Sequence, residues 1–141
     1  MIKLKNLIRE IKASEAYDDR SALQTVIDGR RPLGFISLQF PTKITRDEFW
    51  DVARQHAIQV VPVEKNPYDA YIYYSAGNRD AAIELRDIAN RYDGYLSAEA
   101  TKQDTIRIGQ LLGYDQADID DFVATHYPAD EFDWTGIKDA P

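Results

Sequence analysis

The chain has 141 residues, no cysteine and a formal net charge of −7. This length predicts one domain that buries roughly two thirds of its unfolded surface, so it can fold without a cross-link. The lack of cysteine excludes disulfides, thiolate metal sites and cysteine nucleophiles. No stretch approaches the roughly 20 apolar residues of a membrane span, and charges interrupt the apolar positions of residues 1–12. We therefore expect no membrane contact, no signal peptide and a cytoplasmic location.

Apolar side chains recur at helical spacing near the start of the chain, where they predict an amphipathic helix: Ile2, Leu4, Leu7, Ile8 and Ile11. A second short helix is predicted from Ser21 to Asp28, with Gly29 as its end. Residues 1–32 therefore form a predicted N-terminal helical segment.

Residues 33–99 alternate between strand and helix patterns. Strands are predicted over 33–40, 58–64, 69–75 and 95–98, and Pro62 within the second strand indicates a sheet edge or a bulge. One helix opens at Thr45, with Glu48 expected to complete a capping box, and the other opens within residues 77–80. This order predicts an α+β fold, the ferredoxin-like split βαβ (βαββαβ), with a four-stranded antiparallel sheet.

Such a sheet is expected to carry both connecting helices on one face. In the strand over 69–75, Tyr71 and Tyr73 point to one side, and Ile72 and Tyr74 point to the other. Both sides are apolar enough to be buried, so the second face needs a cover. The extra N-terminal helices, the C-terminal helices or a partner subunit could supply it.

Residues 100–127 predict two C-terminal helices. Thr101 is the expected N-cap of the first, Gly113 its end and Asp115 the cap of the second. Residues 128–141 form an acidic tail with three apolar anchors, Phe132, Trp134 and Ile137. The tail could fold back over the sheet, dock on another subunit, or enter a groove of a foreign partner. We favour the first two, because exposed tryptophan and phenylalanine promote unwanted association.

The negative charge gathers at the C-terminal end. Residues 115–141 hold eight acidic residues and one basic residue, whereas the other residues balance. An acidic end repels phosphates, which argues against nucleic-acid binding. It favours a basic partner, such as the N-terminal segment of the same chain or of another subunit.

Carboxylates and tyrosines give the best catalytic candidates. Glu64 and Glu99 lie near predicted strand ends, and Tyr71 lies on a predicted strand. Such groups can move a proton or hold a cation or an adenine ring. The tyrosines fit an ordinary amphipathic core and interface equally well. No spacing predicts a metal site, and no cofactor is expected.

Two further segments are candidates for ligand binding. Asn78 and Arg79 lie where a strand leads into a helix N-terminus, which can bind an anion. The simpler interpretation is an ordinary turn with Asn78 or Asp80 as N-cap. Arg30 and Arg31 could bind a phosphate or a carboxylate, although such a pair more often meets nearby acids at a helix end.

The opening residues Met1-Ile2-Lys3-Leu4-Lys5 resemble the start of many small tailed-phage accessory proteins. The element order resembles the GlnB-like group of trimeric ferredoxin-like domains, which includes phage enzymes that degrade S-adenosylmethionine. That resemblance implies a homotrimer in the host cytoplasm, with active sites between subunits that use a tyrosine and a glutamate. In this chain, the catalytic residues would have to be Glu64 with Tyr71, or Glu99.

Two functions follow as expectations. The first is a small acidic binding or assembly module, phage-encoded, that acts through protein–protein contacts. The alternative is a trimeric enzyme or sensor with a nucleotide-like ligand between subunits, for example an S-adenosylmethionine lyase. A third hypothesis is a nucleic-acid mimic. It is weaker than the other two, because only the final quarter of the chain is strongly acidic.

Overall fold

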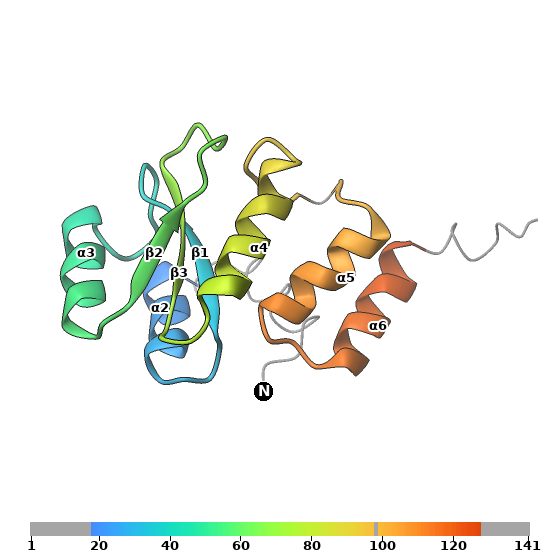
Figure 1. Cartoon of the computed structure of the whole chain (residues 1–141), viewed down its shortest axis with the longest axis horizontal. Coiled ribbons are helices and arrows are strands. Elements are labelled where there is room, and N and C mark those ends of the chain that lie inside the picture. The colour runs from blue at the N-terminus through green and yellow to red at the C-terminus, as the bar shows by residue number, and fades with distance from the viewer. Residues whose placement is uncertain (1–17, 98, 128–141) are drawn as a thin grey trace, which may run out of the picture.

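The computed structural model describes residues 18–97 and 99–127, which form a mixed α+β fold (Figure 1). The predicted helix over residues 2–11 lies outside these ranges. The elements in chain order are α2 (Asp19–Ile27), β1 (Leu33–Ser37), α3 (Arg46–Gln55), β2 (Gln59–Pro62), β3 (Ala70–Tyr74), α4 (Arg79–Asn90), α5 (Lys102–Leu111) and α6 (Gln116–His126).

The three strands form one antiparallel sheet in the order β1-β3-β2. Tyr74 of β3 lies opposite Leu33 of β1 on one side and Gln59 of β2 on the other. The predicted fourth strand is not found. Residues 95–97 are not strand, because the chain turns after α4 and the Tyr95 N–H donates to the Tyr92 carbonyl at 3.2 Å; residue 98 lies outside the described residues. The ferredoxin-like sheet of four strands is therefore not seen in the described part of the chain.

Helices cover both faces of the sheet (Figure 1). Ile36 and Tyr73 pack with α2 and α3 on one face, whereas Ile72 and Tyr74 pack with α4 on the other. The prediction that both connecting helices share one face is wrong, because α3 and α4 lie on opposite faces. Since both faces of the strands are apolar, each needs its own helical layer. The predicted alternation of side chains along β3 is confirmed.

Thr45 and Thr101 cap α3 and α5 as the sequence predicts, whereas Asp115 occupies the N-cap position of α6 without a side-chain hydrogen bond to the helix. The Glu48 N–H donates to Thr45 Oγ1 at 3.1 Å, and the Asp104 N–H donates to Thr101 Oγ1 at 3.1 Å. The Glu48 side chain does not complete the capping box. Its Oε1 instead accepts a hydrogen bond from Arg20 Nη2 at 2.7 Å, which ties α3 to α2.

The helices α5 and α6 lie beyond α4, away from the sheet (Figure 1). Ile119 and Val123 of α6 form a separate small core with Tyr114, while Leu111 of α5 joins the main core. Polar contacts add to this packing, because Arg31 Nη2 donates to the Tyr114 hydroxyl at 2.9 Å. The C-terminal helices are therefore attached through α4 and through the turn before β1.

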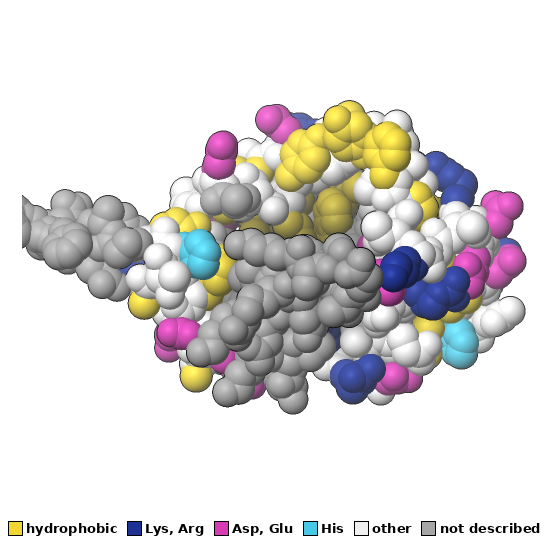
Figure 2. Space-filling model, turned by 180° about the vertical axis from the view of Figure 1, so that it is seen from behind, with side chains coloured by type: hydrophobic (Ala, Val, Ile, Leu, Met, Phe, Trp, Pro, Cys, Tyr) yellow, Lys and Arg dark blue, Asp and Glu magenta, His cyan; other side chains and the backbone are white. Residues whose placement is uncertain are grey.

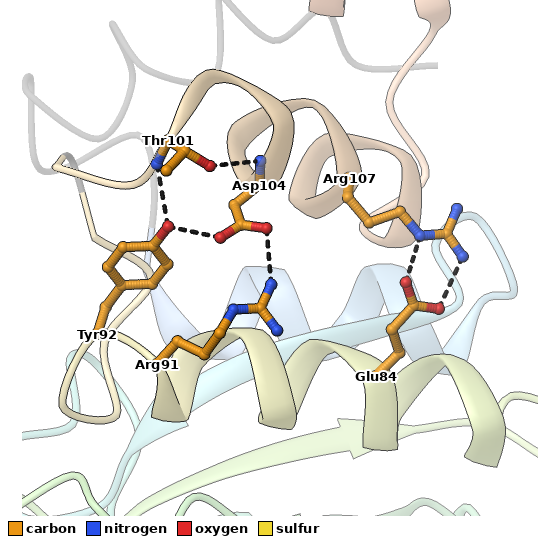
Figure 3. Close-up of polar contacts among 6 residues, drawn as sticks. All are labelled: Glu84, Arg91, Tyr92, Thr101, Asp104 and Arg107. Atoms are coloured by element: carbon orange, nitrogen blue, oxygen red, sulfur yellow. Dashed lines mark hydrogen bonds and ion pairs between the residues drawn. The ribbon is translucent and has the colours of Figure 1, made fainter.

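Figure 3 shows the polar contacts that join α4 to α5. Asp104 of α5 accepts hydrogen bonds from Arg91 Nη2 at 2.7 Å and from the Tyr92 hydroxyl at 2.5 Å. The same hydroxyl accepts from the Thr101 N–H at 3.0 Å. The hydrogen bond from the Tyr92 hydroxyl, together with the hydrogen bond and the charge of Arg91, lowers the pKa of Asp104. A second, more exposed pair joins Arg107 to Glu84.

We expect Asp104→Asn to lower the free energy of unfolding by about 1–2 kcal/mol at pH 7, because it weakens two charge-assisted hydrogen bonds. The folded pKa of Asp104 lies below its ordinary value, so its contribution is complete above about pH 4 and fades as the pH falls further. Urea denaturation at pH 7, 5 and 3.5 measures this difference.

Glu84→Gln is the matched control for Asp104→Asn. Its ion pair with Arg107 is close to half exposed, so we expect a smaller loss at pH 7. Equal losses for the two substitutions would show that burial of Asp104 adds nothing to the contact.

Candidate functional site

Three large aromatic side chains stand exposed at one end of the sheet. Phe40 is 67% exposed, Tyr68 42% and Tyr95 38%. The ring centroids of Phe40 and Tyr68 lie 5.8 Å apart, and those of Tyr68 and Tyr95 lie 6.3 Å apart. Figure 2 shows a ridge of hydrophobic side chains along the upper rim of the molecule. We name these three residues the aromatic platform.

Asn66 holds two parts of the platform together. This buried side chain donates from Nδ2 to the Gly94 carbonyl at 2.8 Å, and its Oδ1 accepts from the Tyr68 N–H at 2.7 Å. One amide therefore fixes both the turn that carries Tyr68 and the turn that leads into Tyr95. Because the bond to Gly94 is buried and the bond from Tyr68 is partly buried, this arrangement is costly to open.

The segment after β1 is tied to the same turn. The Tyr68 carbonyl accepts from Ser37 Oγ at 2.5 Å and from the Gln39 N–H at 3.3 Å. The Leu38 N–H donates to the Asp69 carbonyl at 2.9 Å. Phe40 follows directly, so the backbone positions it relative to Tyr68. The platform is therefore held in place on its own scaffold before any partner binds.

Each platform segment contains a residue in the left-handed backbone region. These are Lys43 with φ of 62°, Asp69 with φ of 56° and Asp93 with φ of 60°. Non-glycine residues adopt this region at an energetic cost, and such residues gather at functional sites. Three of the four such residues in the described part of the chain lie in the platform segments, and the fourth, Ala57 with φ of 55°, precedes β2 at the other end of the sheet.

Charges around the platform are of both signs. Arg46 forms an ion pair with Asp69 at 2.5 Å, whereas Lys43 and Lys65 form none with the described residues. Desolvation raises the pKa of the Tyr95 hydroxyl, and the neighbouring Tyr68 hydroxyl and Asp93 carboxylate raise it further. Tyr95 is therefore neutral at physiological pH. The platform therefore offers an apolar contact surface that is surrounded by a rim of charged side chains.

Tyr71, a predicted catalytic residue, lies on the α3 face of the sheet. Its ring meets Trp50 edge-on at a centroid distance of 5.4 Å. Its hydroxyl hydrogen-bonds Asp69, which lowers the pKa of Asp69 and raises that of Tyr71. A raised tyrosine pKa makes a poorer base, and the ring contributes to packing instead.

Glu64 and Glu99, the other predicted catalytic residues, are both exposed. Glu64 Oε1 accepts from Asn90 Nδ2 of α4 at 3.3 Å. Glu99 lies before α5, where its N–H donates to Ser97 Oγ at 2.9 Å. No contact joins Glu64, Tyr71 and Glu99 to one another among the described residues. Their catalytic role stays a prediction.

The four predicted ligand-binding residues gather at the opposite end of the sheet from the platform. The Ser75 N–H donates to the Pro32 carbonyl at 3.3 Å, which brings the segment of Arg30 and Arg31 beside the turn that precedes α4. Arg30 is exposed and pairs with Asp28 at 3.3 Å. Arg31 is buried, and its guanidinium lies 4.8 Å from the centre of the Tyr114 ring.

Asn78 and Arg79 both have partners within the fold. Asn78 occupies the N-cap position of α4 without a side-chain cap, and its Nδ2 donates to Ser75 Oγ at 2.9 Å. Arg79 Nη1 donates to the Tyr74 hydroxyl at 3.1 Å. These contacts match the ordinary-turn interpretation. Anion binding here stays a prediction.

The sequence reasoning missed Phe40, Asn66 and Gly94 as parts of a site. Phe40 is the last residue of the strand predicted over 33–40, and no motif in the sequence marks Asn66 or Gly94 as part of a site. Nothing in the sequence pairs residues 28 positions apart, as the bond from Asn66 to Gly94 does. The predicted partner-binding residues Phe132, Trp134 and Ile137 lie outside the described residues.

Comparison with protein-family models, with curated proteins and with solved structures found no match. Within residues 18–97 and 99–127, no helix combines the length and hydropathy needed to cross a bilayer. The same residues contain no group of three or more histidine, aspartate or glutamate side chains that could hold a metal ion.

Proposed function

We propose that the protein is a non-catalytic binding module that contacts a partner protein through the aromatic platform. The exposure of Phe40, Tyr68 and Tyr95 side by side carries this proposal. Exposed aromatic clusters are uncommon on monomeric surfaces and mark contact sites, where aromatic residues contribute much of the binding energy. Assembly through protein–protein contact was the first expectation from the sequence, at a different surface.

The partner segment is an extended peptide with aromatic or aliphatic side chains at alternate positions. Residues two apart in an extended chain lie on one side and about 6.7 Å apart. The platform rings are spaced at 5.8 and 6.3 Å, so successive side chains of such a peptide can meet successive rings. Catalysis by Glu64, Tyr71 and Glu99 is no part of this proposal, since no observed contact unites them.

Selection from a displayed random-peptide library tests this function. We expect peptides with alternating apolar residues to be enriched on the full chain and to lose at least about tenfold in affinity, or about 1.4 kcal/mol, on a Phe40→Ser, Tyr68→Ser double variant. The same selection is carried out in parallel on the chain without residues 128–141, so that this segment cannot block access of the peptides to the aromatic platform.

Arg79→Ala is the matched control for this selection. It removes an exposed side chain at the opposite end of the sheet, and its binding should equal that of the parent. Selected peptides that bind the double variant as tightly as the parent would overturn the platform as the contact surface. So would the absence of any enriched peptide on both chains.

A further inference from the structure

We propose that the C-terminal segment of this same chain, residues 128–141, binds across its own aromatic platform. This inference rests on the proposed function, because it names an occupant of the same surface. The platform is then covered in the resting protein, and a partner must displace the segment to bind.

The start of the segment lies within reach of the platform. The Tyr127 hydroxyl donates to the Ala100 carbonyl at 2.8 Å and shares a 2.6 Å hydrogen bond with Thr105 Oγ1. Ala100 ends the loop that begins at Tyr95, and five residues of chain span at most about 18 Å. The segment therefore departs from beside the Tyr95 loop.

The length of the segment is sufficient. Its 14 residues span up to about 46–50 Å when fully extended. Phe132 and Trp134 are two residues apart, so an extended chain presents both on one side, about 6.7 Å apart. This spacing is close to the separations of the platform rings, and Ile137 supplies a third apolar contact.

Apolar contact, rather than charge, carries this interaction. The segment holds four acidic residues and one basic residue, and Lys43 and Lys65, which form no ion pair with the described residues, flank the platform. However, the exposed Glu64 and Asp93 lie in the same loops and oppose that attraction. We therefore expect weak dependence on salt, since screening acts on exposed charges and not on ring contacts.

The covalent connection makes a weak contact sufficient. A short flexible linker gives an effective concentration in the millimolar range. With an intrinsic dissociation constant of about 0.1–0.3 mM, the segment occupies the platform most of the time. A synthetic peptide of residues 128–141 should bind the chain that ends at Tyr127 with a dissociation constant in that range.

Hydroxyl-radical footprinting of the full chain, read by mass spectrometry, tests this occupancy. Removal of residues 128–141 should raise oxidation of the three platform residues by about threefold or more. Oxidation of Trp50, which is half-buried on α3, serves as the internal control and should stay constant. Circular dichroism and urea denaturation establish that the shortened chain is folded.

Fluorescence provides a second measurement in the intact chain. The chain has two tryptophans, so Trp50→Phe leaves Trp134 as the only one. Acrylamide should quench Trp134 about threefold less in this chain than in the free peptide 128–141. Adding Phe40→Ser and Tyr68→Ser should remove that protection, whereas adding Arg79→Ala should leave it unchanged.

Three outcomes would overturn the inference. Equal platform oxidation with and without residues 128–141 means that the segment does not bind there. Platform protection that is lost when residues 1–17 are removed assigns the platform to the N-terminal segment. Protection that grows with protein concentration assigns it to a second copy. In each case platform-dependent peptides from the library would still support the proposed function.

Discussion

Replacing Gly94 by alanine should lower the free energy of unfolding by about 3–5 kcal/mol, one of the two largest effects we expect from a single methyl group. Gly94 has φ of 89°, and an added Cβ would lie 2.6 Å from Asn66 Cα and 2.7 Å from Asn66 Cβ. Asn66 is buried and cannot move away without breaking its bond to the Gly94 carbonyl. Backbone strain and steric overlap therefore act together.

Gly77→Ala is the matched control for Gly94→Ala. Gly77 has the same φ of 89°, but an added Cβ would meet no atom within 4 Å. It should therefore cost only the strain of a left-handed alanine, about 1–2 kcal/mol. Urea denaturation of both variants separates the cost of backbone strain from the cost of steric overlap. Equal losses would mean that the turn around Asn66 yields freely and does not hold the platform.

Gly94→Ala should also disturb the platform itself. Since Asn66 bridges the turns of Tyr68 and Tyr95, its displacement moves two of the three rings. Selected peptides should lose affinity for Gly94→Ala under conditions in which the variant remains folded, whereas Gly77→Ala should bind as the parent does. This comparison distinguishes loss of the surface from loss of stability.

Gly34→Ala should lower the free energy of unfolding by about 2–3 kcal/mol, for a different reason. Gly34 lies opposite Tyr73 in the sheet, and an added Cβ would lie 2.5 Å from Cζ of the Tyr73 ring. Tyr73 is 1% exposed and packed against Phe49, so its ring has no free space to enter.

A double-mutant cycle identifies Tyr73 as the cause. Tyr73→Leu alone should cost about 2 kcal/mol, because it leaves space in the core. In the double variant the ring is gone, so Gly34→Ala should add little, and the coupling free energy should be about 2 kcal/mol. Urea denaturation of the four proteins gives this value. Additive losses would show that overlap with the Tyr73 ring is not the cause of the loss in Gly34→Ala.

Local patterns in the sequence predicted much of the secondary structure. Thr45 and Thr101 cap α3 and α5, because a threonine at that position can accept the bond of a free backbone N–H three residues on. Glycines mark the ends of helices for a similarly local reason. The assignment of Ile72 and Tyr73 to opposite faces follows from the two-residue period of a strand.

Contacts between distant segments could not be predicted in this way. No local pattern chooses the face of the sheet for α3 or α4, since either helix could cover either apolar side. Tyr95 fits a strand by composition, but the turn held by Asn66 keeps its segment out of the sheet. Tertiary bonds here override local preference.

The sequence by itself determined where helices and strands form, because capping, turn residues and apolar periodicity act within a few residues. The tertiary structure alone decided that Phe40, Tyr68 and Tyr95 share one surface. These residues come from three segments, and only backbone and amide hydrogen bonds across 28 or more positions place them together. The candidate site of this protein is therefore a product of packing rather than of a sequence motif.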